Sequence, residues 1–238
     1  MQAVWINSRP EMRSERGVVV FAAGWAGSDE LVRHLALPQG YDLLCLFDYR
    51  SFPSATEVRE LYAQIAPYRH KHLIAWSFGV WAAERIFGEA DWTWDGAVAV
   101  NGTPLPVHDT YGIPVRAFAV TVRSIEGAGT GRFLERMCGT QEVLREYYKH
   151  RSTRGLEEIG EELRRLRDGA AETAATVSVP HAGFWTGAVA GTEDAIFPPE
   201  NMMRYWTEAG VRVTAGEGMP HYPLADGEFL MRWIHEAQ

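Results

Sequence analysis

The sequence is poor in cysteine, with two among its 238 residues, Cys45 and Cys138. Two cysteines cannot build the disulfide framework of a small secreted domain, so we expect free thiols in a reducing compartment. The sequence also lacks any apolar run near the ~18 residues that a membrane-spanning helix needs. Residues 1–10 show no basic segment followed by an apolar one, so we expect no secretory signal and predict a cytoplasmic protein.

Basic residues are outnumbered by acidic ones, with 23 Lys or Arg against 31 Asp or Glu. The net charge of -8 argues against nucleic acid as the main partner. Internal repeats and low-complexity tracts are absent, which excludes solenoids and extended arrays. What remains is a chain of 238 residues with 46% hydrophobic residues, enough to bury one sizeable core. We therefore predict one domain over residues 1–238.

Apolar runs alternate with helical segments along much of the chain. Each run is apolar on both faces, which is typical of a parallel sheet covered by helices on both sides. The expected strands are 18–23, 41–47, 72–76, 96–101, 184–190 and 211–215, with 3–7 as a short antiparallel edge strand. Helices are expected from near Ser28, over 56–68 and 78–87, and after Pro198.

The segment 73–83, L-I-A-W-S-F-G-V-W-A-A, passes from a strand through Ser77 into a helix. This is the pattern of a nucleophile elbow, in which a sharp turn exposes a serine hydroxyl at the carboxyl edge of a sheet. Close packing of helix against strand admits only small residues two positions before and after the serine. Ala75 and Gly79 meet that requirement, so Ser77 is the candidate nucleophile.

Two later strand ends carry a candidate acid and a candidate base. Asp194 follows the expected strand 184–190, and His221 lies in the loop after the expected strand 211–215. A histidine within reach of Ser77 would take its proton, and a carboxylate would hold the useful tautomer of that histidine. The order Ser77, Asp194, His221 is the order of α/β-hydrolases. We therefore predict an α/β-hydrolase fold with a catalytic triad.

Other residues of the right types lack this setting at the end of a strand. They are Ser28 and Ser124 as nucleophiles, and His70, His72, His108, His150 and His181 as bases. Three alternative acids stay open: Asp109, after the strand 96–101, Asp226, and Glu193, next to Asp194. His70 and His72 have no nearby cysteine or carboxylate at ligand spacing, so we predict neither a metal nor another cofactor.

The oxyanion of an acyl-transfer intermediate needs two preorganised N–H donors. We expect them to be the backbone amides of Phe78, which follows the nucleophile, and of Trp25, in the loop after strand 18–23. Aromatic side chains near these positions fit the walls of a narrow acyl pocket, or else serve as core. The candidates for substrate contact are Trp76, Phe118, Phe133 and Tyr147.

Between residues 113 and 176 the apolar positions recur at helical spacing. α/β-Hydrolases carry a lid at this place, and a helical subdomain that only stabilises the sheet is the alternative. Residues 115–176 hold 11 Arg or Lys and 10 Asp or Glu, whereas the rest of the chain holds 12 and 21. Most of the arginines fit a solvated helix face. A subset fits a patch for an anionic partner, with Arg132, Arg136, Arg145, Arg151 and Arg154 as candidates.

Several runs of residues together resemble one family. They are F-A-A-G-W at 21–25, L-C-L-F-D-Y at 44–49, A-W-S-F-G-V-W-A-A-E-R at 75–85, V-N-G-T at 100–103, Y-G-I-P at 111–114, R-M-C-G at 136–139 and H-Y at 221–222. They extend over nearly the whole chain and resemble the BioG family of pimeloyl-[acyl-carrier protein] methyl ester esterases of biotin synthesis. Ala75 replaces the generic elbow glycine, as it does in that family, and Ala23 stands where many hydrolases have histidine.

The resemblance implies cleavage of the methyl ester of pimeloyl-[acyl-carrier protein] methyl ester, with release of methanol. It assigns the triad to Ser77, Asp194 and His221, and it implies a strongly acidic partner, the acyl-carrier protein, for the arginines of the insertion. Two alternatives stay open. One is a serine esterase or thioesterase acting on other short acyl substrates, and the other is a binding protein without catalysis on the same fold.

Overall fold

The computed structural model describes residues 1–88, 92–177 and 180–236. Within these ranges seven strands form one sheet in the order β1-β3-β2-β4-β5-β6-β7. The strands are β1 (Gln2–Ile6), β2 (Gly17–Ala22), β3 (Tyr41–Phe47), β4 (His70–Trp76), β5 (Gly96–Val100), β6 (Gly187–Gly191) and β7 (Val213–Gly216).

The strands from β3 to β7 across the sheet are parallel, and β1 alone pairs antiparallel, with Ala3 opposite Leu46 on β3. This confirms the predicted edge strand. Every residue of β2 is buried, because helices cover both faces of the sheet centre and exclude water from alternate side chains alike. The carboxyl ends of the parallel strands consequently share one edge of the sheet.

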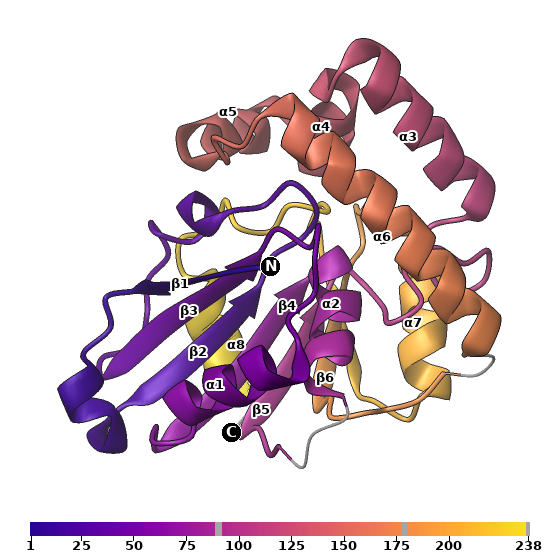
Figure 1. Cartoon of the computed structure of the whole chain (residues 1–238). Helices are drawn as coiled ribbons and strands as arrows, with labels where there is room; N and C mark the ends of the chain where they lie inside the picture. Colours follow the sequence, from indigo (N-terminus) through magenta and orange to yellow (C-terminus); the bar gives the residue numbers. More distant parts are fainter. Residues whose placement is uncertain (89–91, 178–179, 237–238) are drawn as a thin grey trace.

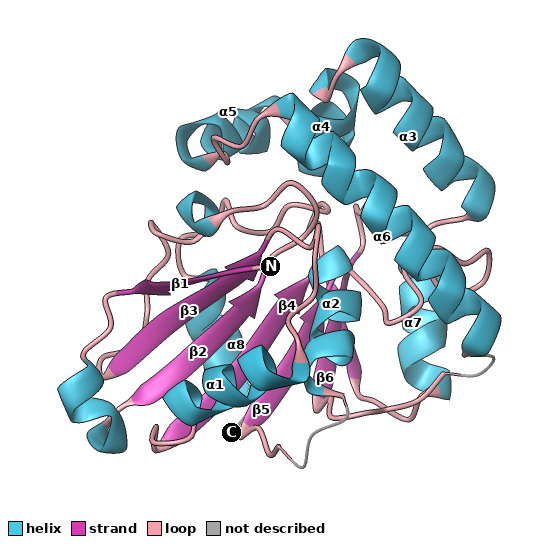
Figure 2. Cartoon of the chain, in the orientation of Figure 1, coloured by secondary structure: helices cyan, strands magenta, loops and turns pink. Residues whose placement is uncertain are grey.

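The helices surround this sheet (Figure 1). They are α1 (Ala55–Ile65), α2 (Phe78–Phe87), α3 (Val115–Ala128), α4 (Gly131–Cys138), α5 (Gln141–His150), α6 (Leu156–Thr176), α7 (Pro199–Glu208) and α8 (Phe229–Glu236), with short 3-10 helices at Pro10–Glu15 and Asp29–Leu31. Helices α1 and α2 lie on one face of the sheet and α8 on the other (Figure 2). No helix in the described part of the chain combines the length and apolar character needed to cross a membrane.

Helices α3 to α6 follow β5 and precede β6, and we call residues 115–176 the insertion. Figure 1 shows these four helices gathered beyond the strand ends, with α6 passing beside α2, where Trp81 Nε1 donates to Thr173 Oγ1. The inner sides of α3 and α6 bury apolar residues such as Phe118, Ile125 and Leu166. Their outer sides carry most of the charged residues of the insertion.

Two predicted elements differ from the structure. The helix expected from Ser28 is wrong, because only one 3-10 turn, Asp29–Leu31, forms there. The chain beyond it bonds to distant partners instead, with the amide of Ala36 donating to Gly227 O at 2.7 Å. The strand expected over 184–190 begins only at Gly187, because the amide of Trp185 closes a turn onto Ala182 O.

Candidate active site

The turn between β4 and α2 holds Ser77 in an unusual backbone conformation. Its φ is 60° and its ψ is -129°, a region that side-chain-bearing residues rarely adopt. The turn is tight because α2 packs directly on the end of β2. A Cβ added at Gly79 would lie 2.1 Å from Ala22 O, so no larger residue fits. The local geometry is that of a nucleophile elbow.

Ser77, His221 and Asp194 form a continuous hydrogen-bonded chain. The Ser77 Oγ lies 2.9 Å from His221 Nε2, and His221 Nδ1 lies 2.7 Å from Asp194 Oδ2. The other carboxylate oxygen, Asp194 Oδ1, accepts from the amides of Ile196 and Phe197, both at 2.8 Å. With the carboxylate acting as acceptor, Nδ1–H of His221 donates to it, which leaves Nε2 free to accept the serine proton. All three side chains are buried.

Asn101, at the end of β5, joins the loops that carry the acid and the base. Its Nδ2 donates to Pro220 O at 2.9 Å and to His221 O at 3.1 Å, while its Oδ1 accepts from the amide of Gly191 at 2.7 Å. Its φ of 49° turns the side chain toward both loops. Sequence reasoning missed this residue. The available signal was a polar residue directly after a buried strand, in the run V-N-G-T.

The loop after β2 brings Trp25 close to the nucleophile. A Cβ added at Gly24 would lie 3.0 Å from the Ser77 Cβ, so this backbone passes directly against the serine. The amides of Trp25 and Phe78 have no acceptor among the described residues. Unbonded amides next to a serine hydroxyl are what an oxyanion hole requires.

An apolar cavity lies in front of these amides. Trp25, Phe78, Phe118, Phe133 and Ile196 are among its walls. Its volume of about 30 Å³ is room for about one water molecule.

A larger groove of about 500 Å³ lies on the other side of Trp25. Tyr147 and Arg151 line it, together with Trp25 itself. Trp76 lines neither space, and its assignment as a substrate contact stays a prediction. Its indole Nε1 donates to His221 O at 2.7 Å, so Trp76 supports the loop that carries His221.

The five arginines proposed for an anionic partner have different surroundings. Arg132 and Arg145 are exposed and form no ion pair with the described residues. Arg136 is exposed and donates to Ala195 O, and the guanidinium of Arg151 lies 5.4 Å from the centre of the Tyr148 ring. Arg154 is the exception, because its side chain is 8% exposed and pairs with Asp48 and Glu162. The prediction that Arg154 belongs to an exposed patch is wrong.

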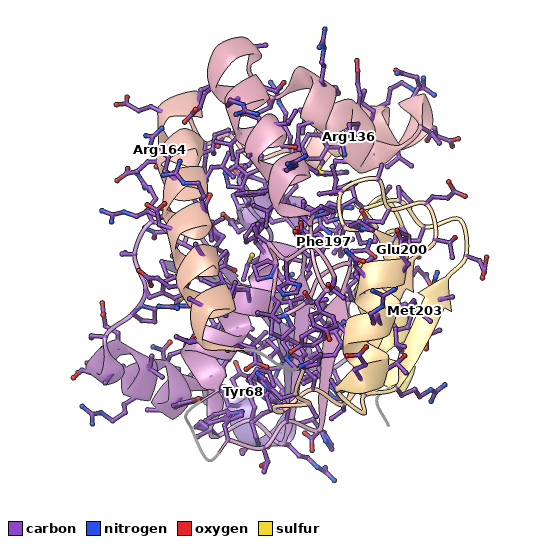
Figure 3. The ribbon with its side chains drawn as sticks, turned by 90° about the vertical axis from the view of Figure 1, so that its right-hand side faces the viewer. Tyr68, Arg136, Arg164, Phe197, Glu200 and Met203 are labelled. Atoms are coloured by element: carbon purple, nitrogen blue, oxygen red, sulfur yellow. The ribbon has the colours of Figure 1, made fainter. Side chains whose placement is uncertain are left out.

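The alternatives weighed from the sequence lie elsewhere. Asp109 Oδ1 accepts from the amide of Val115, the first residue of α3, while Asp226 pairs with Arg232. His150 stacks on His34, at 3.7 Å between ring centres. Within the described residues no three His, Cys, Asp or Glu side chains gather as metal ligands. Arg136 and Phe197 are marked in Figure 3, with Phe197 beneath the insertion, where its ring stacks on His221.

Comparison with known proteins identifies the same family that the sequence resembles. The sequence model of the family described as pimeloyl-ACP methyl esterase BioG matches residues 8–224. A protein of Bacteroides fragilis named malonyl-[acyl-carrier protein] O-methyltransferase is 32% identical over 197 residues, covering 83% of this chain. The match spans only 37% of that longer relative.

Two solved structures are similar. The crystal structure of BioG from Haemophilus influenzae has a TM-score of 0.80 and 29% identity, covering 98% of this chain and 100% of that one. A structure from a study of carboxylesterases of Nitrososphaera gargenis has a TM-score of 0.62 at 12% identity, covering 99% of this chain and 92% of the other. The second likeness concerns the fold alone and supports the α/β-hydrolase architecture.

Proposed function

The chain belongs to the BioG family of pimeloyl-ACP methyl esterases and is therefore a carboxylic ester hydrolase, and we propose that it removes the methyl group of pimeloyl-[acyl-carrier protein] methyl ester. The observation that carries this proposal is the hydrogen-bonded chain Ser77–His221–Asp194. The residue types, their order and their burial all fit nucleophilic acyl transfer.

In the first half-reaction, Ser77 Oγ attacks the ester carbonyl carbon while His221 Nε2 takes the hydroxyl proton. The negative charge on the carbonyl oxygen is stabilised by the amides of Trp25 and Phe78. The intermediate then collapses, and His221 returns the proton to the departing methoxide, which leaves as methanol. Asp194 stabilises the imidazolium throughout without taking the proton.

In the second half-reaction, a water molecule attacks the acyl-serine ester. His221 Nε2 takes a proton from this water, and the resulting tetrahedral intermediate collapses with return of that proton to Ser77 Oγ. The product is pimeloyl-[acyl-carrier protein] with a free distal carboxylate. No group beyond the triad, the two amides and water enters this sequence of steps.

We further propose that residues 1–238 form one domain in which residues 113–176 act as a lid. The small cavity beneath Phe118 and Phe133 supports a lid that opens to admit substrate. The groove lined by Tyr147 and Arg151 approaches Trp25 from the surface and offers a path for an extended carrier arm.

The carrier protein itself would dock on the exposed arginines of the insertion. Arg132, Arg136, Arg145 and Arg151 remain in this set, and Arg154 leaves it. The balance of 11 basic to 10 acidic residues in the insertion, within a chain of net charge -8, supports the insertion as the side that an acidic partner approaches.

Incubation of the purified protein with methyl pimeloyl-[acyl-carrier protein] tests the proposal. We expect the carrier species to lose the mass of one methylene group and methanol to appear. Release of the whole acyl chain with regeneration of the free carrier thiol would instead identify a thioesterase. If neither the ester nor the thioester is cleaved and Ser77 is not labelled by a fluorophosphonate, the protein is not a serine hydrolase.

A further inference from the structure

The loop that carries Trp25 is bonded to the insertion at three points. The indole Nε1 of Trp25 donates to Ile159 O at 2.7 Å, and the amide of Ala26 donates to Glu162 Oε2 at 3.1 Å. Arg154, just before α6, donates from Nη1 to Gly27 O at 3.2 Å. The oxyanion loop and the insertion are therefore one bonded unit in this structure.

Glu162 is the centre of this unit. Its side chain has no exposure to solvent, and both carboxylate oxygens are used. Oε1 accepts from the amide of Tyr49 at 2.8 Å, while Oε2 accepts from Ala26 and from Arg154 Nη1 at 2.8 Å. A buried carboxylate is retained only when such donors replace water, so removal of any one partner leaves the others unsatisfied.

The backbone gives an independent reason why the loop needs this support. Ala26 has a φ of 61°, in the left-handed region that residues other than glycine and asparagine seldom occupy. Its amide donates to Glu162, and the amide of Gly27 closes a turn around it onto Gly24 O at 3.1 Å. If the bond to Glu162 is lost, the strained backbone of Ala26 can change conformation. The amide of Trp25, one residue away, would then change its direction as well.

We propose that Glu162, with Arg154, is a positioning residue that holds the loop 24–27 so that the amide of Trp25 points at the oxyanion. This inference rests on the proposed function, because it presumes that Ser77 attacks an ester and that Trp25 stabilises the intermediate. It goes beyond that function by giving the insertion a role in the chemical step itself. Glu162 touches neither substrate nor reacting atoms and acts through the loop alone.

Glu161, one residue earlier on α6, provides a matched control. Its side chain is 49% exposed and pairs with Arg50 at 3.5 Å, away from the loop 24–27. E162Q keeps the volume of the side chain, but an amide group can accept on one side only, where the carboxylate accepts on both. E161Q makes the same chemical change on the same helix without touching the oxyanion loop.

We expect E162Q to lower kcat for a small methyl ester such as dimethyl pimelate by about 10- to 100-fold with KM little changed, since small misplacements of catalytic groups cost that much. E161Q should match the wild-type protein. A trifluoromethyl ketone adds to Ser77 Oγ as its carbon–oxygen double bond becomes an alkoxide, with the serine proton moving to His221. Its affinity should fall in E162Q by a similar factor, because that alkoxide occupies the oxyanion hole.

R154K serves as a second variant should E162Q fold poorly. It keeps the charge but loses the fork that bonds Glu162 and Gly27 through Nη1 and Asp48 through Nη2. We expect a smaller fall in kcat in the same direction. R167K is its control, because Arg167 of α6 is exposed and pairs with Asp168, away from the loop 24–27. Equal kcat and equal ketone affinity in E162Q, R154K and their controls would overturn the inference while leaving the esterase proposal intact. A wild-type protein that cleaves no ester would overturn both.

Discussion

The edge of the sheet and the outer side of the insertion are built on different principles. At the sheet edge, Ser77, Asp194 and His221 are buried, and every polar atom in their chain has a partner within the protein. On the outer side of the insertion, Arg132 and Arg145 are exposed and have no ionic partner among the described residues. The first region is buried and bonded within the protein, and the second is exposed to solvent.

The inner side of the insertion resembles the sheet edge, because it is hydrogen-bonded to the loops of the candidate active site. Helix α4 bonds to both loops there, because Met137 O accepts from the amide of Tyr222 at 3.0 Å and Arg136 donates to Ala195 O. Helix α6 holds the oxyanion loop through Glu162. One helical segment thus has a side that supports the chemistry and a side that faces solvent, and substitutions on the two sides should separate the two roles.

The largest effect is expected at the sheet edge. S77A and H221A should each lower kcat by about 10⁴- to 10⁶-fold for every ester substrate, because nucleophile and base act as a unit. Methanol release measures the rate, and thermal unfolding checks that the fold is kept. S124A, in α3, is the control and should keep the full rate. A tenth of the wild-type rate in S77A would mean that another group performs the attack, and the same rate in H221A would mean that another base takes the proton.

A second substitution tests how the triad loops are held. N101A removes the bonds to Pro220 O, His221 O and the amide of Gly191, so we expect kcat to fall by about 10- to 100-fold and the free energy of unfolding to fall by about 2–4 kcal/mol. The pH-dependence of kcat should change as well, because His221 loses a fixed position.

Asn201 is the matched control for Asn101. It is also a buried amide, and its Nδ2 donates to Asp109 O at 3.1 Å and Gly112 O at 2.8 Å, in a loop that carries no triad residue. N201A should destabilise the protein to a similar degree yet leave kcat within about twofold at temperatures where it stays folded. Equal losses of kcat in the two variants would reduce Asn101 to a structural role.

The triad positions could be predicted from the sequence because each follows a buried parallel strand. Parallel strands bring their carboxyl ends to one edge, so Ser77, Asp194 and His221 need no further information to converge. Their distances and bonds agree with that expectation, although their roles in catalysis stay a prediction. The fold class followed from the same alternation of strands and helices, and it is confirmed.

Residues whose partners are distant in the sequence could not be assigned in this way. Arg154 was predicted to belong to a patch for an anionic partner, but it pairs with Asp48, 106 residues away. Glu162 bonds to backbone 113 and 136 residues away, and Asn101 to backbone 119 and 120 residues away. Such contacts depend on the packed structure, and no local pattern of charge or hydropathy encodes them.

The outer side of the insertion should affect only the carrier-linked substrate. In the double variant R132E and R145E, we expect kcat/KM for methyl pimeloyl-[acyl-carrier protein] to fall by about tenfold at low salt, because reversed charges slow and weaken docking of an acidic partner. Cleavage of dimethyl pimelate should be unchanged. Added salt should shrink the difference between the variant and the wild-type protein.

R164E is the control for charge reversal on the insertion. Arg164 lies on α6, 48% exposed and 3.7 Å from Glu126, and Figure 3 shows it on the opposite side of the insertion from Arg136. If R164E weakens turnover of the carrier substrate as much as the double variant does, the effect comes from overall charge. In that case the insertion has no local docking patch at Arg132 and Arg145.

The smallest effect is expected where α5 meets the loop of the base. His34 stacks on His150 of α5, and its Nε2 lies 2.9 Å from Leu224 O, three residues beyond His221. Burial lowers the pKa of His34 below its usual value, and the nearby His150 lowers it further, while Leu224 O and Glu146 act in the opposite direction. Protonation of His34 is therefore less favourable in the folded protein than in the unfolded chain.

A lowered histidine pKa makes the folded state relatively more stable above the ordinary pKa of about 6.5, and this advantage is lost as the pH falls through the lower value in the fold. H34Q keeps a donor for Leu224 O but cannot titrate. Between about pH 7.5 and pH 5.5, the wild-type Tm should fall further than that of H34Q, by an extra amount on the order of 1 °C. Equal slopes would mean that α5 stays joined to the base loop whatever the charge of His34, and that contact would then belong with the fixed side of the insertion.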